Sequence, residues 1–304
     1  MARTSKRRSD DPGDVRHGGA ETESVGDTAR DHLRAAVGGL LVGLPLLWTM
    51  EMWEHGATAP PLKLLLLFAL AFVVIIGFNA VSGFRRERDW VELVVDTTQG
   101  MGVSIVLAAA MLFVLGRLEV ELGLPTLIGR IALLSIPIAF GTALASTVLS
   151  EPEEGGSSEP VGSIGRLFVA AGGSLYFALN VAPTDEVRVL GSEADVPLLL
   201  VAMVASLAIS LAIVFIVEFP GSRAGATKPK DPGPLDHPVG ETIAAYAISL
   251  LVSLALLVSF GLSDGLGPRA LVGYVVMLGT LASFGSAAGR LLVGGSSGEE
   301  GSDK

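Results

Sequence analysis

Two stretches of the sequence place an acid at the start of a long apolar run. Asp96 comes before Gln99 and Ser104 in "DTTQGMGVSIVLAAAMLFVLG", and Glu241 comes before Ser249 in "ETIAAYAISLLVSLALLVSFG". If each run is a helix, residues four apart lie on one face, so each acid shares its face with small or polar residues. Such a carboxylate can attract a cation into a path through the membrane. It can equally be a cap that meets the positive end of the helix dipole.

A further polar residue, Asn180, lies within another apolar run, where its amide needs a partner or water. The candidates for an ion or solute path are therefore Asp96, Gln99, Ser104, Asn180, Glu241 and Ser249. No catalytic residue is assigned, because the sequence has no cysteine, no H-E-x-x-H and no phosphate-binding glycine loop. We expect neither an enzyme nor a bound metal or cofactor.

The apolar residues make up half of the 304 and occur in uninterrupted blocks. A helix of about 20 apolar residues crosses the hydrocarbon core of a bilayer, and the blocks lack the alternation of barrel strands. The sequence predicts an all-α, polytopic membrane protein. The eight expected transmembrane helices cover about 33–53, 62–83, 96–116, 126–149, 164–183, 196–218, 241–262 and 269–293.

The basic residues predict the orientation of these helices. With eight spans both termini share one side, and placing them inside assigns sixteen of the 21 Lys and Arg residues to the cytoplasm. The protein is then expected in the cell membrane of a prokaryote, with cytoplasmic termini. Residues 1–32 are expected to be a disordered tail and residues 294–304 a flexible end.

The sequence suggests an internal repeat. Residues 33–149 and 164–293 would be the two copies, and residues 150–163 an acidic linker between them. Gly39 and Gly173 each stand twelve residues before an acid, and Asp96 and Glu241 each begin a span. Shared membrane composition is the simpler explanation, but the order of such matched pairs favours duplication. Two parallel four-helix repeats would be related by a pseudo-two-fold axis along the membrane normal.

Small residues at four-residue spacing predict where helices pack closely. Gly39 and Gly43 form one G-x-x-x-G, Gly285 and Gly289 form another, and Gly141 stands four residues before an alanine. Such spacing lets helix backbones approach each other in a bilayer, where the hydrophobic effect does not drive association. We interpret these five glycines as packing residues.

The eight-span layout and the motifs "AFGTALA" (139–145) and "SFGSAAG" (283–289) carry a resemblance. Residues 33–293 resemble a family of uncharacterised prokaryotic integral membrane proteins of unknown function. The resemblance implies a multi-pass membrane protein and brings no functional residues with it.

The amino-acid composition limits the classes of molecule that the protein is expected to bind. The net charge is −10, and five lysines stand beside sixteen arginines, a balance typical of salt-adapted proteins. Nucleic-acid binding is disfavoured; the lipid bilayer is the expected partner, and a homo-oligomer is possible. We expect a channel or secondary transporter for a small ion or solute, a cation rather than an anion, with its path between the repeats. The alternative is a membrane scaffold or sensor subunit that transports nothing.

Overall fold

The computed structural model describes residues 25–82, 90–118, 120–149, 163–218 and 237–295, and all of its regular elements in these ranges are helices. The first half of the molecule comprises α1 (Val25–Leu47), α2 (Met50–Thr58), α3 (Pro61–Ser82), α4 (Trp90–Val114), the short 3-10 turn η1 (Val120–Leu122) and α5 (Leu124–Leu149). The second half comprises α6 (Ser163–Leu179), α7 (Asp185–Glu193), α8 (Val196–Glu218), α9 (Pro238–Ser259) and α10 (Pro268–Gly295). The prediction of an all-α protein is confirmed for the described residues.

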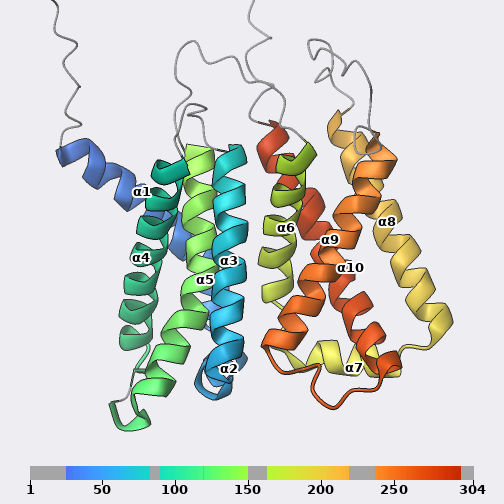
Figure 1. Ribbon diagram of the computed structural model, residues 1–304, viewed down its shortest axis with the longest axis horizontal. Coiled ribbons are helices and arrows are strands. Elements are labelled where there is room, and N and C mark those ends of the chain that lie inside the picture. Colours follow the sequence, from blue (N-terminus) through green and yellow to red (C-terminus); the bar gives the residue numbers. More distant parts are fainter. Residues whose placement is uncertain (1–24, 83–89, 119, 150–162, 219–236, 296–304) are drawn as a thin grey trace, which may run out of the picture.

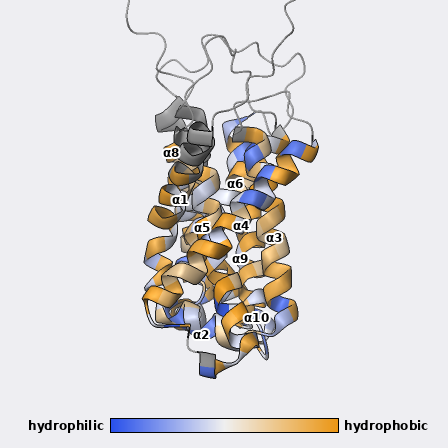
Figure 2. Cartoon of the chain, turned by 90° about the vertical axis from the view of Figure 1, so that its left-hand side faces the viewer, coloured by the Kyte–Doolittle hydropathy of each residue, from blue (hydrophilic) through white to orange (hydrophobic). Residues whose placement is uncertain are grey.

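Six helices are long and apolar enough to cross a membrane, namely α3, α4, α5, α8, α9 and α10. They correspond to six of the eight predicted spans. Hydrophobic residues cover the middle of the bundle, and hydrophilic residues gather toward its two ends (Figure 2). α1, α4, α6 and α9 begin at the same end of the bundle at which α3, α5, α8 and α10 finish (Figure 1).

The first predicted span, a single helix over 33–53, is wrong. The chain bends by 87° between α1 and α2, so it forms a broken span or a re-entrant segment. Pro45 lies inside the last turn of α1, where a proline removes a helical hydrogen bond. Side chains then serve the carbonyl groups at the break, because the Thr49 hydroxyl donates to the Pro45 carbonyl at 2.9 Å and the Trp53 indole donates to the Leu47 carbonyl at 2.8 Å.

The fifth predicted span, 164–183, is shorter than expected. α6 ends at Leu179 after 17 residues, and the chain turns before α7 begins at Asp185. α1 begins at Val25, inside the segment 1–32 that was expected to be disordered. Residues 1–24, most of the expected linker at 150–163 and nearly all of the C-terminal tail lie outside the described residues.

Glycines allow close packing at matching places in the two halves. α1 packs on α5, where a Cβ added to Gly141 would lie 2.6 Å from the Val42 Cβ. α6 packs on α10, where the backbones of Gly173 and Gly285 leave no room for a Cβ on either residue. At the other end, α2 packs on α5 and α7 packs on α10, and glycine again faces the neighbouring backbone in each pair.

The two halves meet through α3 and α5 of the first and α6 and α9 of the second. Aromatic rings fill this contact: the ring of Phe168 lies where Gly77 leaves space, and the ring of Phe140 lies against Gly172. Phe140 also stacks on Tyr176 with ring centres 5.9 Å apart. The seam between the halves is therefore closed by side chains.

The predicted two-fold axis does not relate the halves. Such an axis would make α8 pack on α1 as α3 packs on α6. Among the helix pairs packed together in the described part of the chain, α8 contacts only α9 and α10. Figure 1 shows α1 and α8 at opposite edges of the molecule. The halves instead stand side by side, joined head to tail.

Candidate functional site

The centre of the second half contains buried polar side chains from four helices. We call this set the polar interior: Ser174 from α6, Ser206 and Ser210 from α8, Thr242, Tyr246, Ser249 and Ser253 from α9, and Ser283 and Ser286 from α10. The four residues of α9 recur every three or four positions, so they lie along one face of that helix. This face points into the second half and is covered by α6, α8 and α10.

Two hydrogen bonds tie the helices of the polar interior together. The Ser174 and Ser249 hydroxyl oxygens are 2.9 Å apart, and the Ser210 hydroxyl lies 3.5 Å from the Ser283 carbonyl oxygen. Ser249 also donates to the Ala245 carbonyl at 2.9 Å, so its single proton is used and Ser174 must donate to it. Of the residues predicted for a path, Ser249 is thus the one that lies in this interior.

Two hydroxyl groups of the polar interior lack a hydrogen bond within the described residues. Ser286 is 2 % exposed and Tyr246 is 6 % exposed, and neither hydroxyl oxygen has a partner of acceptable geometry there. Tyr246 interacts with Ser206, whose own proton is donated to the Met203 carbonyl at 3.0 Å, although the geometry of the Tyr246 and Ser206 hydroxyls falls short of a hydrogen bond. Each hydroxyl therefore keeps capacity for a further hydrogen bond.

Glu241 lies at the end of the bundle where α9 begins, beside the polar interior. One of its carboxylate oxygens lies 3.4 Å from Nε of Arg166 on α6 and 3.3 Å from Nε of Arg290 on α10. The side chains of Glu241 and Arg290 are only 12 % and 11 % exposed, so this ion pair is largely shielded from solvent. We refer to these three residues as the clamp, because they join the ends of three helices.

Asp96 and Glu241, which hold matching positions in the sequence, do not share one interior. Asp96 lies on α4, which packs on α1, α3 and α5, whereas α9 packs on α3, α6, α8 and α10. The two helices belong to different halves and stand apart in Figure 1. The matched positions in the sequence therefore do not converge in space.

The other predicted path residues have local roles. Ser104 is fully buried in the first half and donates to the Gly100 carbonyl of its own helix at 2.7 Å. Asn180 follows the end of α6 and donates to the Tyr176 carbonyl at 2.7 Å, which serves a carbonyl that the ending helix leaves open. Gln99 lies on the exposed surface of α4.

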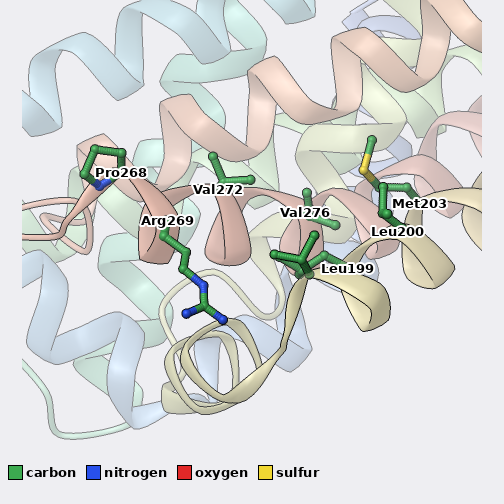
Figure 3. A pocket seen from close by; sticks show the side chains of 8 residues that line it. Leu199, Leu200, Met203, Pro268, Arg269, Val272 and Val276 are labelled. Atoms are coloured by element: carbon green, nitrogen blue, oxygen red, sulfur yellow. The ribbon is translucent and has the colours of Figure 1, made fainter.

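A shallow apolar groove of about 340 Å³ runs along the outside of the second half, between α8 and α10 (Figure 3). Its lining comprises Val196, Leu199, Leu200, Met203, Pro268, Arg269, Val272 and Val276. Arg269 is the one charged residue among them, and it lies at the start of α10. The groove lies on the outside of the second half and takes none of its lining from the polar interior.

Comparison with known proteins places the chain in a family. Residues 31–293 match the model of the family described as "Putative integral membrane protein (DUF2391)". The chain belongs to this family. The function of the family is unknown. No curated protein and no solved structure matches the chain. Family membership and the apolar helices together identify a multi-pass integral membrane protein, as the resemblance in the sequence predicted.

Sequence reasoning missed most of the polar interior, although a signal was present. When the halves are aligned at the offsets of their landmark pairs, six interior positions, two of them half-buried in the first half, change from apolar to polar. Leu40, Leu70, Val74, Met101, Ala108 and Ala139 in the first half correspond to Ser174, Ser206, Ser210, Tyr246, Ser253 and Ser283 in the second. An alignment that looks only for similar residues in the two halves overlooks these positions. Comparing the halves for positions that differ in polarity would have found them.

Proposed function

We propose that the protein is a channel or transporter for a small polar solute, which passes through the polar interior of the second half. The observation that carries this proposal is the pair of buried hydroxyl groups, on Tyr246 and Ser286, that lack a partner among the described residues. An unpartnered polar group is costly inside a membrane protein, where lipid supplies no hydrogen bonds. A passing solute or its water would provide the missing partner.

The closed seam is the reason for moving the path away from the contact between the halves. Phe140 and Phe168 fill that contact, and the hydrophobic cluster around Phe78 extends along it. A path there would require several aromatic side chains to move together. The polar interior lines its space with hydroxyl groups in place of aromatic rings.

The clamp changes the expected charge of the solute. The sequence favoured a cation because acids begin the third and seventh spans, but two guanidinium groups now face the Glu241 carboxylate. Opposite charges at this distance offset the attraction that a lone carboxylate would exert on a cation. We therefore infer a neutral or anionic polar solute, and we expect no catalysis and no resident metal or cofactor.

An internal duplication accounts for the construction of the two halves. The packing of α1 and α2 on α5 corresponds to that of α6 and α7 on α10, and the packing of α4 on α5 to that of α9 on α10. The left-handed backbone of Gly116 after α4 has its counterpart in Gly261 after α9. These correspondences support eight membrane segments in two parallel four-helix repeats, with α1–α2 and α6–α7 as the two broken segments.

The orientation follows from the distribution of charge. The helix ends that carry the termini also carry Arg166 and Arg290, and the sixteen basic residues of this side outnumber the five of the other. Basic residues gather on the cytoplasmic side of membranes. We infer that both termini are cytoplasmic in a prokaryotic cell membrane.

Flux in proteoliposomes tests the proposal directly. The variant Tyr246→Met/Ser253→Ala/Ser283→Ala gives the second half the residues of the first, and a loss of about 1.4 kcal/mol of solute binding corresponds to a tenfold lower flux. Ser104→Ala in the first half is the matched control and should conduct like wild type. Wild-type flux of polar solutes through the triple variant would contradict the proposal.

Cysteine labelling provides a second test, because the chain has no cysteine of its own. Ser253 and Ala108 occupy corresponding positions in the two halves, and both are fully buried. A small water-soluble thiol reagent should modify Ser253→Cys and leave Ala108→Cys unmodified. Equal protection of both thiols would contradict a path through the second half.

The alternative is a membrane scaffold without transport, and one observation favours it. Most hydroxyls of the polar interior donate to carbonyl groups of their own helix, as Ser253 does to the Ser249 carbonyl at 2.8 Å. Such bonds let serine pack inside a membrane helix without any solute. A wild-type protein that carries no flux across a panel of cations, anions and neutral polar solutes would favour the scaffold.

A further inference from the structure

One face of α3 is covered inside the molecule, and its counterpart on α8 is not. Leu64, Phe68, Ala71 and Ile75 follow each other at helical spacing and belong to the clusters that α3 shares with α6 and α9. The corresponding residues of α8 are Leu200, Val204, Leu207 and Leu211. Leu200 is 56 % exposed and Val204 is 67 % exposed, whereas Leu207 and Leu211 are half-buried, so this face has less cover than α6 and α9 give to α3.

The opposite edge of the molecule shows the complementary difference. Val37, Leu41, Leu44 and Trp48 form an exposed stripe along α1, where Leu41 is 71 % exposed. The corresponding residues of α6 are Ala171, Leu175, Ala178 and Ala182, the last three of which are fully buried in the cluster that includes α3. Each exposed edge therefore matches one side of the contact that joins the halves.

We propose that copies of this chain associate head to tail in the membrane, with α8 of one copy on the α1 and α4 edge of the next. The proposal rests on the correspondence of the two halves described above, and it is independent of any transported solute. A contact between unlike faces is heterologous, so it continues from copy to copy until a ring closes or a filament forms.

The composition of the α8 face suits a contact between helices. Ala205, Ala208 and Ala212 lie on the exposed side of α8 among larger apolar residues. Small residues let membrane helices approach closely, which supplies the packing contacts that replace the hydrophobic drive in lipid. The internal contact also uses a small residue, since Gly77 on α3 receives the ring of Phe168. The corresponding positions hold Ile213 and Arg34, so the alanines of α8 would provide the close approach between copies.

We expect a turn of the neighbouring copy to bind in the groove between α8 and α10. In the internal contact, Lys63 at the start of α3 meets the turn after α9, where it pairs with Asp264 at 2.6 Å and lies 3.4 Å from the place of a Cβ on Gly261. The residue corresponding to Lys63 is Leu199, which lines the groove. The turn that corresponds to the one after α9 is the turn around Gly116, after α4. Leu199 takes the place of the lysine, so the contact between copies lacks the ion pair that the internal one carries.

Disulfide cross-linking in native membranes tests the arrangement. α3 and α6 run in opposite directions, and the contact of Gly77 with Phe168 brings Ala71 level with Leu175. The corresponding pair is Leu207 and Leu41. Under mild oxidation, a chain carrying both Leu41→Cys and Leu207→Cys should give a ladder of cross-linked dimers, trimers and larger species.

The controls separate this arrangement from its alternatives. Each single variant should stay monomeric on denaturing gels, and a dimer from either alone would indicate a like-to-like contact and overturn the proposal. Val201→Cys combined with Leu41→Cys should not cross-link, because Val201 corresponds to Leu65, which is 64 % exposed and so lies outside the internal contact. No cross-linking in any variant would leave lipid as the cover of α8 and also overturn it. Flux through reconstituted single copies is measured separately, so either proposal can fail without the other.

Discussion

Val74 on α3 and Ser210 on α8 occupy corresponding positions and are buried to the same degree, yet one is an aliphatic side chain and the other a hydroxyl. The same change recurs at five further interior positions of the two halves. Two changes run in the other direction, Ser135 to Gly279 and the half-buried Asn79 to Phe215. The helices, glycine contacts and turns agree between the halves. The two halves therefore share the packing of their helices but differ in the polarity of their interiors.

A hydroxyl in place of a methyl group changes little in volume and much in hydration. A buried polar group needs a partner, and leaving it without one costs about 1–3 kcal/mol. The first half avoids that cost with an apolar core, in which Leu112 and Leu133 are fully buried. The second half accepts it at Tyr246 and Ser286. A region that keeps unpartnered polar groups is the better candidate for function.

The largest effect is expected from exchanging the interiors. The triple variant Tyr246→Met/Ser253→Ala/Ser283→Ala should lose most of its flux while its thermal stability in detergent stays equal to wild type or rises, because one unpartnered hydroxyl is removed. The reciprocal variant Met101→Tyr/Ala108→Ser/Ala139→Ser should keep its flux and lose stability. Parallel losses of flux and stability in the first variant would indicate a purely structural role.

The glycine contacts should respond alike in both halves. Gly141→Ala and Gly285→Ala each force a Cβ against a neighbouring helix, at 2.6 Å from the Cβ of Val42 and of Phe177 respectively. Overpacking of this kind costs about 1–3 kcal/mol in the free energy of unfolding. Gly102→Ala is the control, because nothing lies within 4 Å of an added Cβ there. A large loss in one half only would show that the packing of the halves is not equivalent.

Substitutions in the clamp should change the free energy of unfolding by less than the glycine substitutions do, and this effect should be confined to the second half. Glu241→Gln and Arg290→Gln should each destabilise the protein by about 1–2 kcal/mol, less than for a deeply buried pair because the clamp is slightly exposed. Their double variant should lose less than the sum, which a double-mutant cycle measures as coupling. Asp96→Asn is the comparison in the first half, because Asp96 occupies the position that corresponds to Glu241. Strict additivity would mean that the ion pair is not formed in solution.

The smallest effect is expected at the hydroxyl bridge between α6 and α9. Ser174→Ala removes a hydrogen bond between two membrane helices, which is worth about 0.6 kcal/mol on average. Ser104→Ala in the first half removes only a bond within α4, so its unfolding midpoint should match wild type. If both variants behave alike, the bridge contributes nothing beyond local bonding.

Much of the fold could be predicted from the sequence, because helix length and hydrophobicity are local properties. Six spans, the packing glycines and the family resemblance follow from residue type and spacing alone. The break after Pro45 was harder to predict, since many membrane helices carry a proline and remain continuous. Here Thr49 and Trp53 supply the hydrogen bonds that make the break stable.

The sequence by itself determined that this chain lies in a membrane and roughly where six of its spans lie, because a bilayer admits only helices of sufficient apolar length. The tertiary structure decided which residues share a space. Asp96 and Glu241 match in sequence and lie in different halves, whereas Arg166, Glu241 and Arg290 are distant in sequence and form one clamp. Which face of a helix meets which neighbour depends on the packing of all helices at once. The order of residues along the sequence does not by itself show which helices pack together.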